Sequence, residues 1–441
     1  MMESHVELVH RWIEDHTDEV VNLLTDLIRV PSVTPYFNEE KMYMREGDAQ
    51  RVLEKYLTQM GMKTEFSYPD PIRLAKYEGK AGYYPNYTFE DRPNLYGIYK
   101  GTGGGRSLLL SGHIDVVARG VGWTVDPFGG YRKDGKIYGR GAVDMKGGIA
   151  CMTVAFKAIQ ECHIRLKGDV QIGTVVGEEA GGMGTLAFVD HGYRADGCLI
   201  TEPTHLNVAP LCRGILWGKI TIPGRNGHIE LPQGDWRTGG AVDAIDKLTV
   251  FLDKLKELNR KWAQSKQHKY LPIPCQINIA QINAGEFPTT FASSAEVIFN
   301  AQYLPEEKDD NGLGGKVKIE IEDFIKEFAQ ADDWLKENPP IVTWIVDADC
   351  GETLDDQPFF HVVRESAEKT NARSLVEGIC CHTDMGWFCN VGIPTINLGP
   401  GDPRLAHQAN EFVEISELVQ CTKIISSLIL EWCEPTIQQQ D

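Results

Sequence analysis

A histidine and an aspartate, separated by one residue, follow a short apolar segment in the N-terminal half of the chain. Leu108 to Leu110 predict a buried strand, and Gly112 lets the backbone turn so that His113 emerges at its carboxyl end. Open α/β sheets place their sites at this end. Residues two apart on an extended segment share a face, so we expect Asp115 to accept the free N–H of the His113 imidazole. By itself the pair is more typical of a surface loop, and a site requires further ligands.

Carboxylates occupy similar positions elsewhere. Asp144 stands just ahead of a predicted helix that extends to about residue 161, where an aspartate also serves as an ordinary helix cap. Glu178 and Glu179 follow the strand predicted over residues 170–176. Because adjacent side chains on an extended segment face opposite ways, one glutamate can face a metal while the other faces a substrate. A solvated acidic loop is the alternative.

The remaining candidates are Glu202, at the end of another short apolar strand, and His407, after the strand and turn of residues 394–401. The full set supplies two imidazoles, three carboxylate ligands and a spare glutamate, which suits a hydrolytic site with two metal ions. Nitrogen and oxygen ligands without thiolate favour Zn²⁺, with Co²⁺ or Mn²⁺ as alternatives. One carboxylate must bridge, because paired metal ions lie about 3.5–4 Å apart. A free carboxylate must accept a proton from the attacking water.

Length and composition restrict the class of protein. A chain of 441 residues predicts two domains. The formal net charge of −19 argues against nucleic acid and against anionic membrane surfaces as partners, and no apolar stretch reaches the length of a membrane span. The N-terminal residues lack the basic start and apolar run of a signal peptide. Eleven scattered cysteines without a C-x-x-C pair favour reduced thiols, so we expect a cytoplasmic protein.

Hydrophobic periodicity predicts an α/β chain. In the outer parts we expect helices over residues 6–29, 47–60, 358–369 and 415–432, and strands over 94–99 and 107–111 joined by a hairpin turn at 101–105. Residues 67–92, rich in Tyr and Pro, predict an irregular loop of unknown use. In the middle, strands at 216–222, 276–282, 295–304 and 341–346 and helices at 240–258 and 320–329 give the order βαββαβ, the ferredoxin-like split unit.

The sequence resembles the family of di-metal hydrolases that includes acetylornithine deacetylase, succinyl-diaminopimelate desuccinylase, aminoacylases and glutamate carboxypeptidase. The matching stretches, in the family's order, are SGHIDVV, WTVDPFGG to GRGAVDMKGG, GEEAGGMGT, ITEPT and GPGDPRLAHQANEFV. The resemblance implies a zinc-peptidase-like catalytic domain with a mixed sheet between helices, formed by residues 1–212 and 354–441. It also implies an inserted ferredoxin-like lid at 213–353 that forms a homodimer.

The resemblance also assigns roles to the metal ligands. It implies that His113 and Glu202 hold one metal ion, that Glu179 and His407 hold the other, and that Asp144 bridges the two.

Three further roles come from the same resemblance. Asp115 would orient His113, and Glu178 would be the general base. His228, in a Gly-His pair after the lid's first strand, would cross the dimer interface and polarise the scissile carbonyl; a loop histidine without a role is the alternative.

The implied activity is metal-assisted hydrolysis of the amide bond of a small N-acyl amine. Many relatives carry an arginine for a substrate carboxylate where this chain has Gln302, and another after a Thr-Asp pair where this chain has Met385. We therefore expect a substrate without an essential α-carboxylate, with Trp387 and Phe388 stacking on a ring, as in the family's formylaminopyrimidine deformylases. Arg213 or Arg404 could replace the missing charge.

Two alternatives to this function stay open. One is a dipeptidase or carboxypeptidase of the same family, and the other is a non-catalytic metal-binding scaffold.

Overall fold

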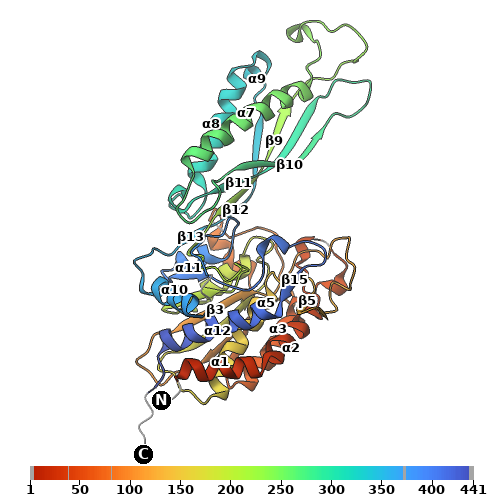
Figure 1. Cartoon of the computed structure of the whole chain (residues 1–441). Coiled ribbons are helices and arrows are strands. Elements are labelled where there is room, and N and C mark those ends of the chain that lie inside the picture. The colour runs from red at the N-terminus through yellow and green to blue at the C-terminus, as the bar shows by residue number, and fades with distance from the viewer. Residues whose placement is uncertain (1–3, 38, 81, 371–373, 437–441) are drawn as a thin grey trace, which may run out of the picture. The chain divides into compact units, whose positions relative to one another are not determined.

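The computed structural model describes residues 4–37, 39–80, 82–370 and 374–436, so the first three residues of the N-terminal stretch considered above lie outside it. The chain forms two compact units, whose elements are labelled in Figure 1. Unit 1 comprises Met1–Cys212, Gly351–Ile379 and Thr383–Asp441, and unit 2 comprises Arg213–Cys350 and Cys380–His382.

A six-stranded mixed sheet runs through unit 1 in the order β1-β2-β6-β3-β7-β14. The central strands β3, β6, β7 and β14 are parallel, whereas β1 and β2 are antiparallel to their neighbours. Every residue of β3 and β6 is buried, which is typical of parallel strands covered on both faces. The strands are β1 (Lys63–Ser67), β2 (Asn94–Tyr99), β3 (Leu108–His113), β6 (Val170–Val175), β7 (Gly197–Ile200) and β14 (Thr395–Asn397).

The predicted hairpin between residues 94–99 and 107–111 is wrong. Strand β6 lies between β2 and β3 and pairs with both, so the glycine-rich turn connects strands that are not neighbours. Local turn chemistry did not reveal this, because β6 lies far along the chain.

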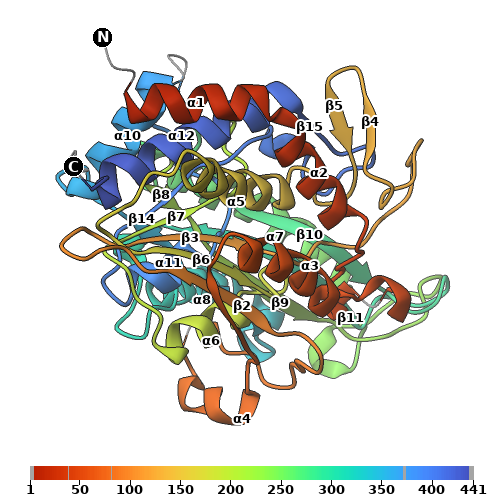
Figure 2. The same cartoon turned by 90° about the horizontal axis from the view of Figure 1, so that it is seen from below.

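Helices cover both faces of this sheet (Figure 2). A side chain at Gly112 would meet Met145 and Ile149 at the start of α5, whereas one at Gly173 would meet Phe188 of α6 on the opposite face. Helix α12 packs along α5, with α1 and α2 outside them. The helices of unit 1 are α1 (His5–Asp15), α2 (Thr17–Ile28), α3 (Glu46–Gln59), α4 (Pro71–Leu74), α5 (Lys146–Glu161), α6 (Met183–His191), α10 (Pro358–Thr370), α11 (Met385–Cys389) and α12 (Ile415–Cys433).

The helix expected over residues 6–29 is two helices. His16 leaves the helical conformation, with φ −120° and ψ 36°, and its N–H donates to the carbonyl of Trp12, which ends α1. Helix α2 begins at the next residue. The apolar period continues across this break, so periodicity alone did not show it.

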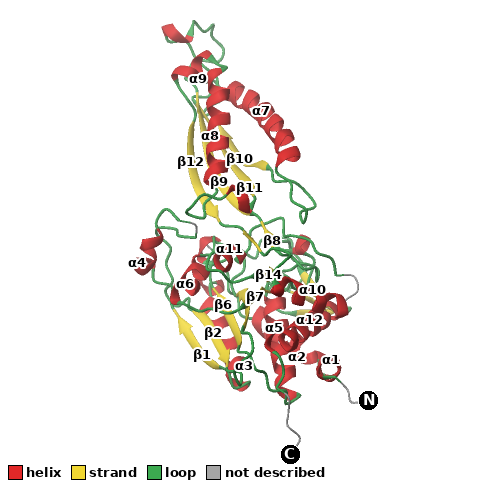
Figure 3. Cartoon of the chain, turned by 90° about the vertical axis from the view of Figure 1, so that its left-hand side faces the viewer, coloured by secondary structure: helices red, strands yellow, loops and turns green. Residues whose placement is uncertain are grey.

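Unit 2 is the predicted βαββαβ arrangement, and the expected fold class is confirmed. Its antiparallel sheet has the order β10-β11-β9-β12, and Figure 3 shows α7 and α8 side by side against it. Alternate residues of β9 are buried, as in a sheet with one covered face. The elements are β9 (Gly214–Pro223), α7 (Ala244–Ser265), β10 (Ile277–Ala284), β11 (Ser294–Tyr303), α8 (Gly315–Gln330), α9 (Asp333–Glu337) and β12 (Ile341–Ala348).

Smaller strands complete unit 1. They pair in the orders β15-β5-β4 and β13-β8, and comprise β4 (Tyr131–Lys133), β5 (Lys136–Tyr138), β8 (Leu211–Cys212), β13 (Gly351–Glu352) and β15 (Phe412–Glu414). Across the described part of the chain, no helix combines the length and the apolar character that crossing a bilayer requires.

Candidate metal centre

The predicted metal ligands meet at one edge of the sheet in unit 1. His113 ends β3, Glu179 follows β6 and Glu202 follows β7, and these strands are parallel, so their carboxyl ends share an edge. Asp144 comes from the turn that leads into α5, and His407 from the loop between β14 and β15.

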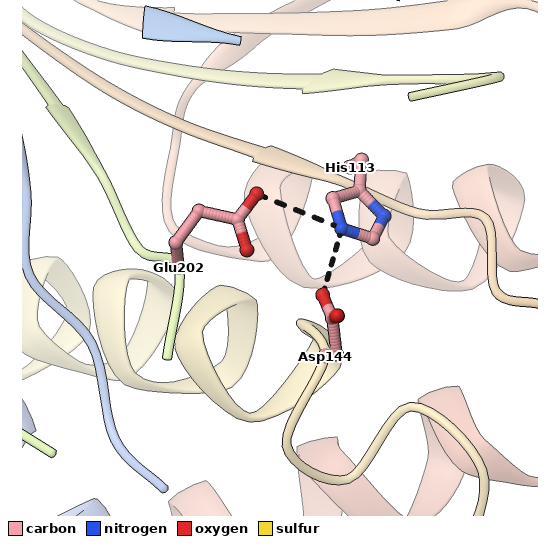
Figure 4. Close-up of side chains that lie close together, drawn as sticks. All are labelled: His113, Asp144 and Glu202. Atoms are coloured by element: carbon pink, nitrogen blue, oxygen red, sulfur yellow. Dashed lines mark hydrogen bonds and ion pairs between the residues drawn. The ribbon is translucent and has the colours of Figure 1, made fainter. Parts of the chain in front are cut away.

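His113, Asp144 and Glu202 form the first group of potential ligands, drawn in Figure 4. The Nε2 atom of His113 lies 3.0 Å from Oδ1 of Asp144 and 3.7 Å from Oε1 of Glu202. One ligand atom from each residue lies within 4.8 Å of the others. Burial opposes a charge on His113, but its hydrogen bond to Asp144 and the charges of Glu202 and Glu178 raise its pKa well above the ordinary value.

The second group consists of Asp144, Glu179 and His407. The Nε2 atom of His407 lies 3.1 Å from Oε2 of Glu179 and 3.4 Å from Oδ2 of Asp144. Hydrogen bonds to Asp144 and Glu179 raise the pKa of His407 to about 10. Asp144 thus turns one oxygen toward each imidazole and belongs to both groups, as a bridging ligand must.

The donor set fits two divalent cations. Two imidazoles and three carboxylates are suitable ligands for zinc and its neighbours. The Oε1 atom of Glu179 is buried and has no hydrogen-bond partner among the described residues, and a buried carboxylate oxygen is costly to leave unpaired. A cation beside Glu179 would satisfy it.

Asp115 contacts His113 through a different group from the carboxylate that the sequence predicted. Its backbone carbonyl, not its carboxylate, lies 2.9 Å from Nδ1 of His113, and its nearer carboxylate oxygen is 3.7 Å away. The carboxylate accepts the backbone N–H groups of Glu178, at 3.2 Å, and Glu179, at 3.1 Å. Asp115 therefore orients His113 through its main chain and holds the two glutamates through its side chain.

Glu178 lies beside the first group without belonging to it. Its Oε2 atom is 3.9 Å from Nε2 of His113. Burial raises the pKa of Glu178 well above the ordinary value, His113 opposes this, and the charges of Asp384 and Glu202 reinforce it. A cation nearby would lower the pKa and favour the carboxylate form that a general base needs.

Asp384, which sequence reasoning did not select, is a further buried acid near this cluster. It accepts hydrogen bonds from Oγ1 of Thr185 at 2.5 Å and from Nε1 of Trp387 at 3.1 Å. Burial raises the pKa of Asp384 to about 7. The Thr-Asp pair is a landmark of the family resemblance, but that resemblance concerns the residue after the pair, and an aspartate before a short helix also resembles an ordinary cap.

A buried ion pair between Arg140 and Glu411 also escaped the sequence analysis. Their side chains meet at 2.6 Å, and the other oxygen of Glu411 accepts the backbone N–H groups of Val143, at 2.8 Å, and Asp144, at 3.2 Å. Arg140 also donates to the carbonyl of His407. This pair thus anchors the segments that carry the bridging aspartate and one histidine.

The expectation that Trp387 and Phe388 offer a free stacking surface is wrong. Phe388 is fully buried and Trp387 is 3% exposed. The Trp387 indole donates to Asp384 and packs so tightly against Gly82 and Gly182 that a Cβ at either glycine would clash with it. Both rings belong to the protein interior.

His228 and Gln302 belong to unit 2, and the candidate ligands belong to unit 1. His228 is exposed in the loop after β9, where its Nδ1 accepts the N–H of Glu230 at 3.3 Å. Gln302 on β11 accepts the N–H of Gln276 at 2.9 Å and donates to Asn300 at 2.9 Å.

An α/β sheet with two imidazole–carboxylate groups at its carboxyl edge, joined by a shared aspartate, is typical of two-metal hydrolases. Residues 109–431 match peptidase family M20/M25/M40, and the chain belongs to this family of amide-bond hydrolases.

Relatives extend the match over the whole chain. The chain is 30% identical over 457 residues to N-formyl-4-amino-5-aminomethyl-2-methylpyrimidine deformylase of Bacillus subtilis, covering 99% of this chain and all of that one. It is 35% identical to succinyl-diaminopimelate desuccinylase of Methylorubrum extorquens, over 95% of this chain and 99% of that one. The structure of a Saccharomyces cerevisiae dipeptidase superposes with a TM-score of 0.73 at 15% identity, over 98% of this chain and 99% of that one, which shows the shared fold.

The Arg140–Glu411 pair leads to a stability prediction. We expect Arg140→Met or Glu411→Gln to lower the free energy of unfolding by about 3–5 kcal/mol, because each leaves a buried charged partner without its counter-charge. The double variant should lose less than the sum by about 1 kcal/mol or more. Urea unfolding measures the free energy of unfolding of the two single variants and of the double variant. Additive losses would mean that the two residues act independently, and the exposed Arg132–Asp18 pair serves as the control that should change little.

Proposed function

We propose that this protein hydrolyses the amide bond of a small N-acyl amine, with an N-formyl group on an aminopyrimidine-like amine as the preferred substrate. The observation that carries the proposal is the pair of ligand groups sharing Asp144, with Glu178 buried beside them. We propose two Zn²⁺ ions as the cofactor, with Co²⁺ or Mn²⁺ as alternatives.

In this proposal His113 and Glu202 would hold one ion, Glu179 and His407 would hold the other, and Asp144 would serve both. Bound divalent cations would supply Lewis-acid polarisation of the amide carbonyl and activation of the attacking water.

Glu178 performs the proton transfers. It accepts a proton from the attacking water and later donates it to the nitrogen of the leaving amine. The carboxylate of Asp115 fixes the backbone of Glu178, so the base keeps a defined position during both transfers.

The contacts of Gln302 and Arg404 support a substrate without an essential carboxylate. Both polar groups of the Gln302 amide bond within unit 2. Arg213 is buried and donates to the carbonyl of Ile273, and Arg404 forms a salt bridge with Asp402. The Arg404 guanidinium is thus paired with a carboxylate that a substrate would have to displace. Arg213 stays the candidate for the missing charge, because its buried Nε has no hydrogen-bond partner among the described residues.

The alternatives remain distinguishable. A dipeptidase of the same family would turn over dipeptides in preference to N-formyl amines, and a non-catalytic scaffold would turn over neither. The intact set of ligands and Glu178 favours an enzyme.

The substrate prediction compares an N-formyl amino acid with its decarboxylated analogue. We expect kcat/KM to differ by less than 10-fold, because glutamine cannot supply the charge of an arginine fork. Steady-state kinetics with the zinc-loaded protein decides it. A preference of about 100-fold, or 2.7 kcal/mol, for the carboxylate would show that another cation binds it.

Measuring the bound metal distinguishes the role of Glu178 as a base from that of Asp144 as a ligand. We expect Glu178→Gln to retain two metal ions and to lose about 100-fold or more of kcat, because only the proton acceptor is removed. Asp144→Asn should lose metal along with activity, because both groups share that ligand. Metal content by mass spectrometry and kcat are measured for both variants. Loss of metal from Glu178→Gln would contradict the role as base.

We further propose a cytoplasmic homodimer in which His228 completes the partner's site and stabilises the oxyanion. His228 lies on an exposed loop with exposed apolar neighbours, Ile229, Leu231 and Phe287, and such patches are typical of interfaces.

The dimer proposal predicts complementation. Glu178→Gln and His228→Ala should each be nearly inactive, whereas a mixed dimer holds one site with both defects and one with neither. Equal mixing should therefore restore on the order of one quarter of the wild-type activity, as a two-fold symmetric dimer requires. Absence of recovery after subunit exchange has been verified by mass spectrometry would rule out a shared site.

A further inference from the structure

The tyrosine-rich segment after residue 81 lies along the loop that carries Glu178 and Glu179. The hydroxyl of Tyr87 donates to the carbonyl of Ala180 at 2.6 Å. The ring of Tyr84 packs directly on Gly181, where a Cβ would lie 2.5 Å from the ring. The segment that the sequence left without a use is therefore in contact with the loop of the proposed general base.

A third tyrosine extends this contact. The rings of Tyr84 and Tyr87 are stacked, with centroids 5.4 Å apart and an interplanar angle of 29°. Tyr36 lies next to Tyr87, with centroids 6.5 Å apart. We call Tyr36, Tyr84 and Tyr87 the aromatic shelf.

The chain segment just before Tyr36 pairs with the segment that follows His113 and Asp115. Val33 and Thr34, which precede Tyr36 in the chain, pair with Val116, the residue after Asp115. The shelf is therefore in contact with the loop that holds Glu178 and Glu179, and Tyr36 follows a segment that pairs next to Asp115.

The three tyrosines differ in what the fold requires of them. Tyr84 and Tyr87 are half-buried, and they hold the glutamate loop through packing and a hydrogen bond. Tyr36 is 48% exposed and contacts other rings, Phe37 and Tyr87, rather than that loop. Packing on the glutamate loop accounts for Tyr84 and Tyr87, whereas Tyr36 keeps 48% of its surface exposed beside the ring of Tyr87.

We propose that the aromatic shelf binds the planar ring of the leaving amine, with Tyr36 as the exposed contact. This deepens the proposed function and rests on it. An exposed aromatic face held by neighbouring rings stacks on another aromatic ring, and such pairs favour a flat ring over a saturated one of the same size. Because Trp387 and Phe388 are buried, the shelf supplies the aromatic surface for the substrate ring in this proposal.

The test uses two substrates that differ only in ring planarity, N-formylbenzylamine and N-formylcyclohexylmethylamine, with the zinc-loaded full-length protein. We expect wild type to prefer the aromatic substrate in kcat/KM, and Tyr36→Leu to reduce that preference by about 3- to 10-fold, mainly through KM. Tyr36→Phe should retain the preference. Tyr131→Leu is the matched control, because Tyr131 is also 48% exposed and has a ring neighbour, Tyr138, but lies on β4.

Calorimetric binding of benzylamine provides a readout that does not depend on turnover. We expect Tyr36→Leu to weaken it by a similar factor and Tyr131→Leu to leave it unchanged. An equal effect of Tyr36→Leu on both substrates, or no effect on benzylamine binding, would overturn the shelf. If wild type hydrolyses neither formamide but binds benzylamine through Tyr36, the proposed function fails and the shelf stands. If it hydrolyses both with no change of preference in Tyr36→Leu, the function stands and the shelf fails.

Discussion

Asp144 directs one oxygen toward each of two imidazoles, and both potential ligand groups of unit 1 depend on that arrangement. Several carboxylates lie close together in a mostly buried region, which is unfavourable unless positive charge is present among them. Burial and neighbouring negative charges raise the pKa values of Glu178, Glu179 and Glu202. Hydrogen bonds to the imidazoles hold the pKa of Asp144 below its ordinary value, although burial opposes this. A cluster with this charge pattern is suited to cations, and the shared carboxylate of Asp144 joins its two ligand groups.

Other side chains hold the segments that carry these ligands. Glu411 binds the backbone at Asp144 and, with Arg140, links that turn to the His407 loop. Asp115 binds the backbone of the two glutamates, and Tyr87 binds the same loop from another side. Such supporting contacts fix the orientation of a ligand before any metal ion or substrate arrives. The geometry of the centre is therefore determined by residues that do not themselves face the reaction.

The sequence predicted the parts of this site that have a local signature. His113, Glu179 and Glu202 each follow an apolar strand, and the parallel pairing of β3, β6 and β7 brings them to one edge. The βαββαβ order of unit 2 was likewise visible in the periodicity. Arg140 and Glu411 lie inside stretches that resemble the family, and Asp384 lies in the Thr-Asp pair, yet their roles were not visible because they come from contacts between segments distant in sequence. Trp387 and Phe388 were wrongly expected to face a substrate. The sequence of an aromatic pair near a motif does not distinguish a ligand-facing pair from a core pair. The strand pairing of β2 with β6 was inaccessible for the same reason.

Residues inside the charged cluster and residues that touch it from other segments differ in how they can affect substrate preference. The residues that surround Asp144 balance the charge of the metal centre. Substituting them therefore changes the catalytic rate more than the substrate preference. Preference must therefore come from segments that touch the centre without entering its charge balance. The shelf is such a segment, because its tyrosines are uncharged and two of them contact the backbone of the glutamate loop. An aromatic surface adds selectivity for ring shape without adding charge, and it can change in sequence while the metal ligands stay the same.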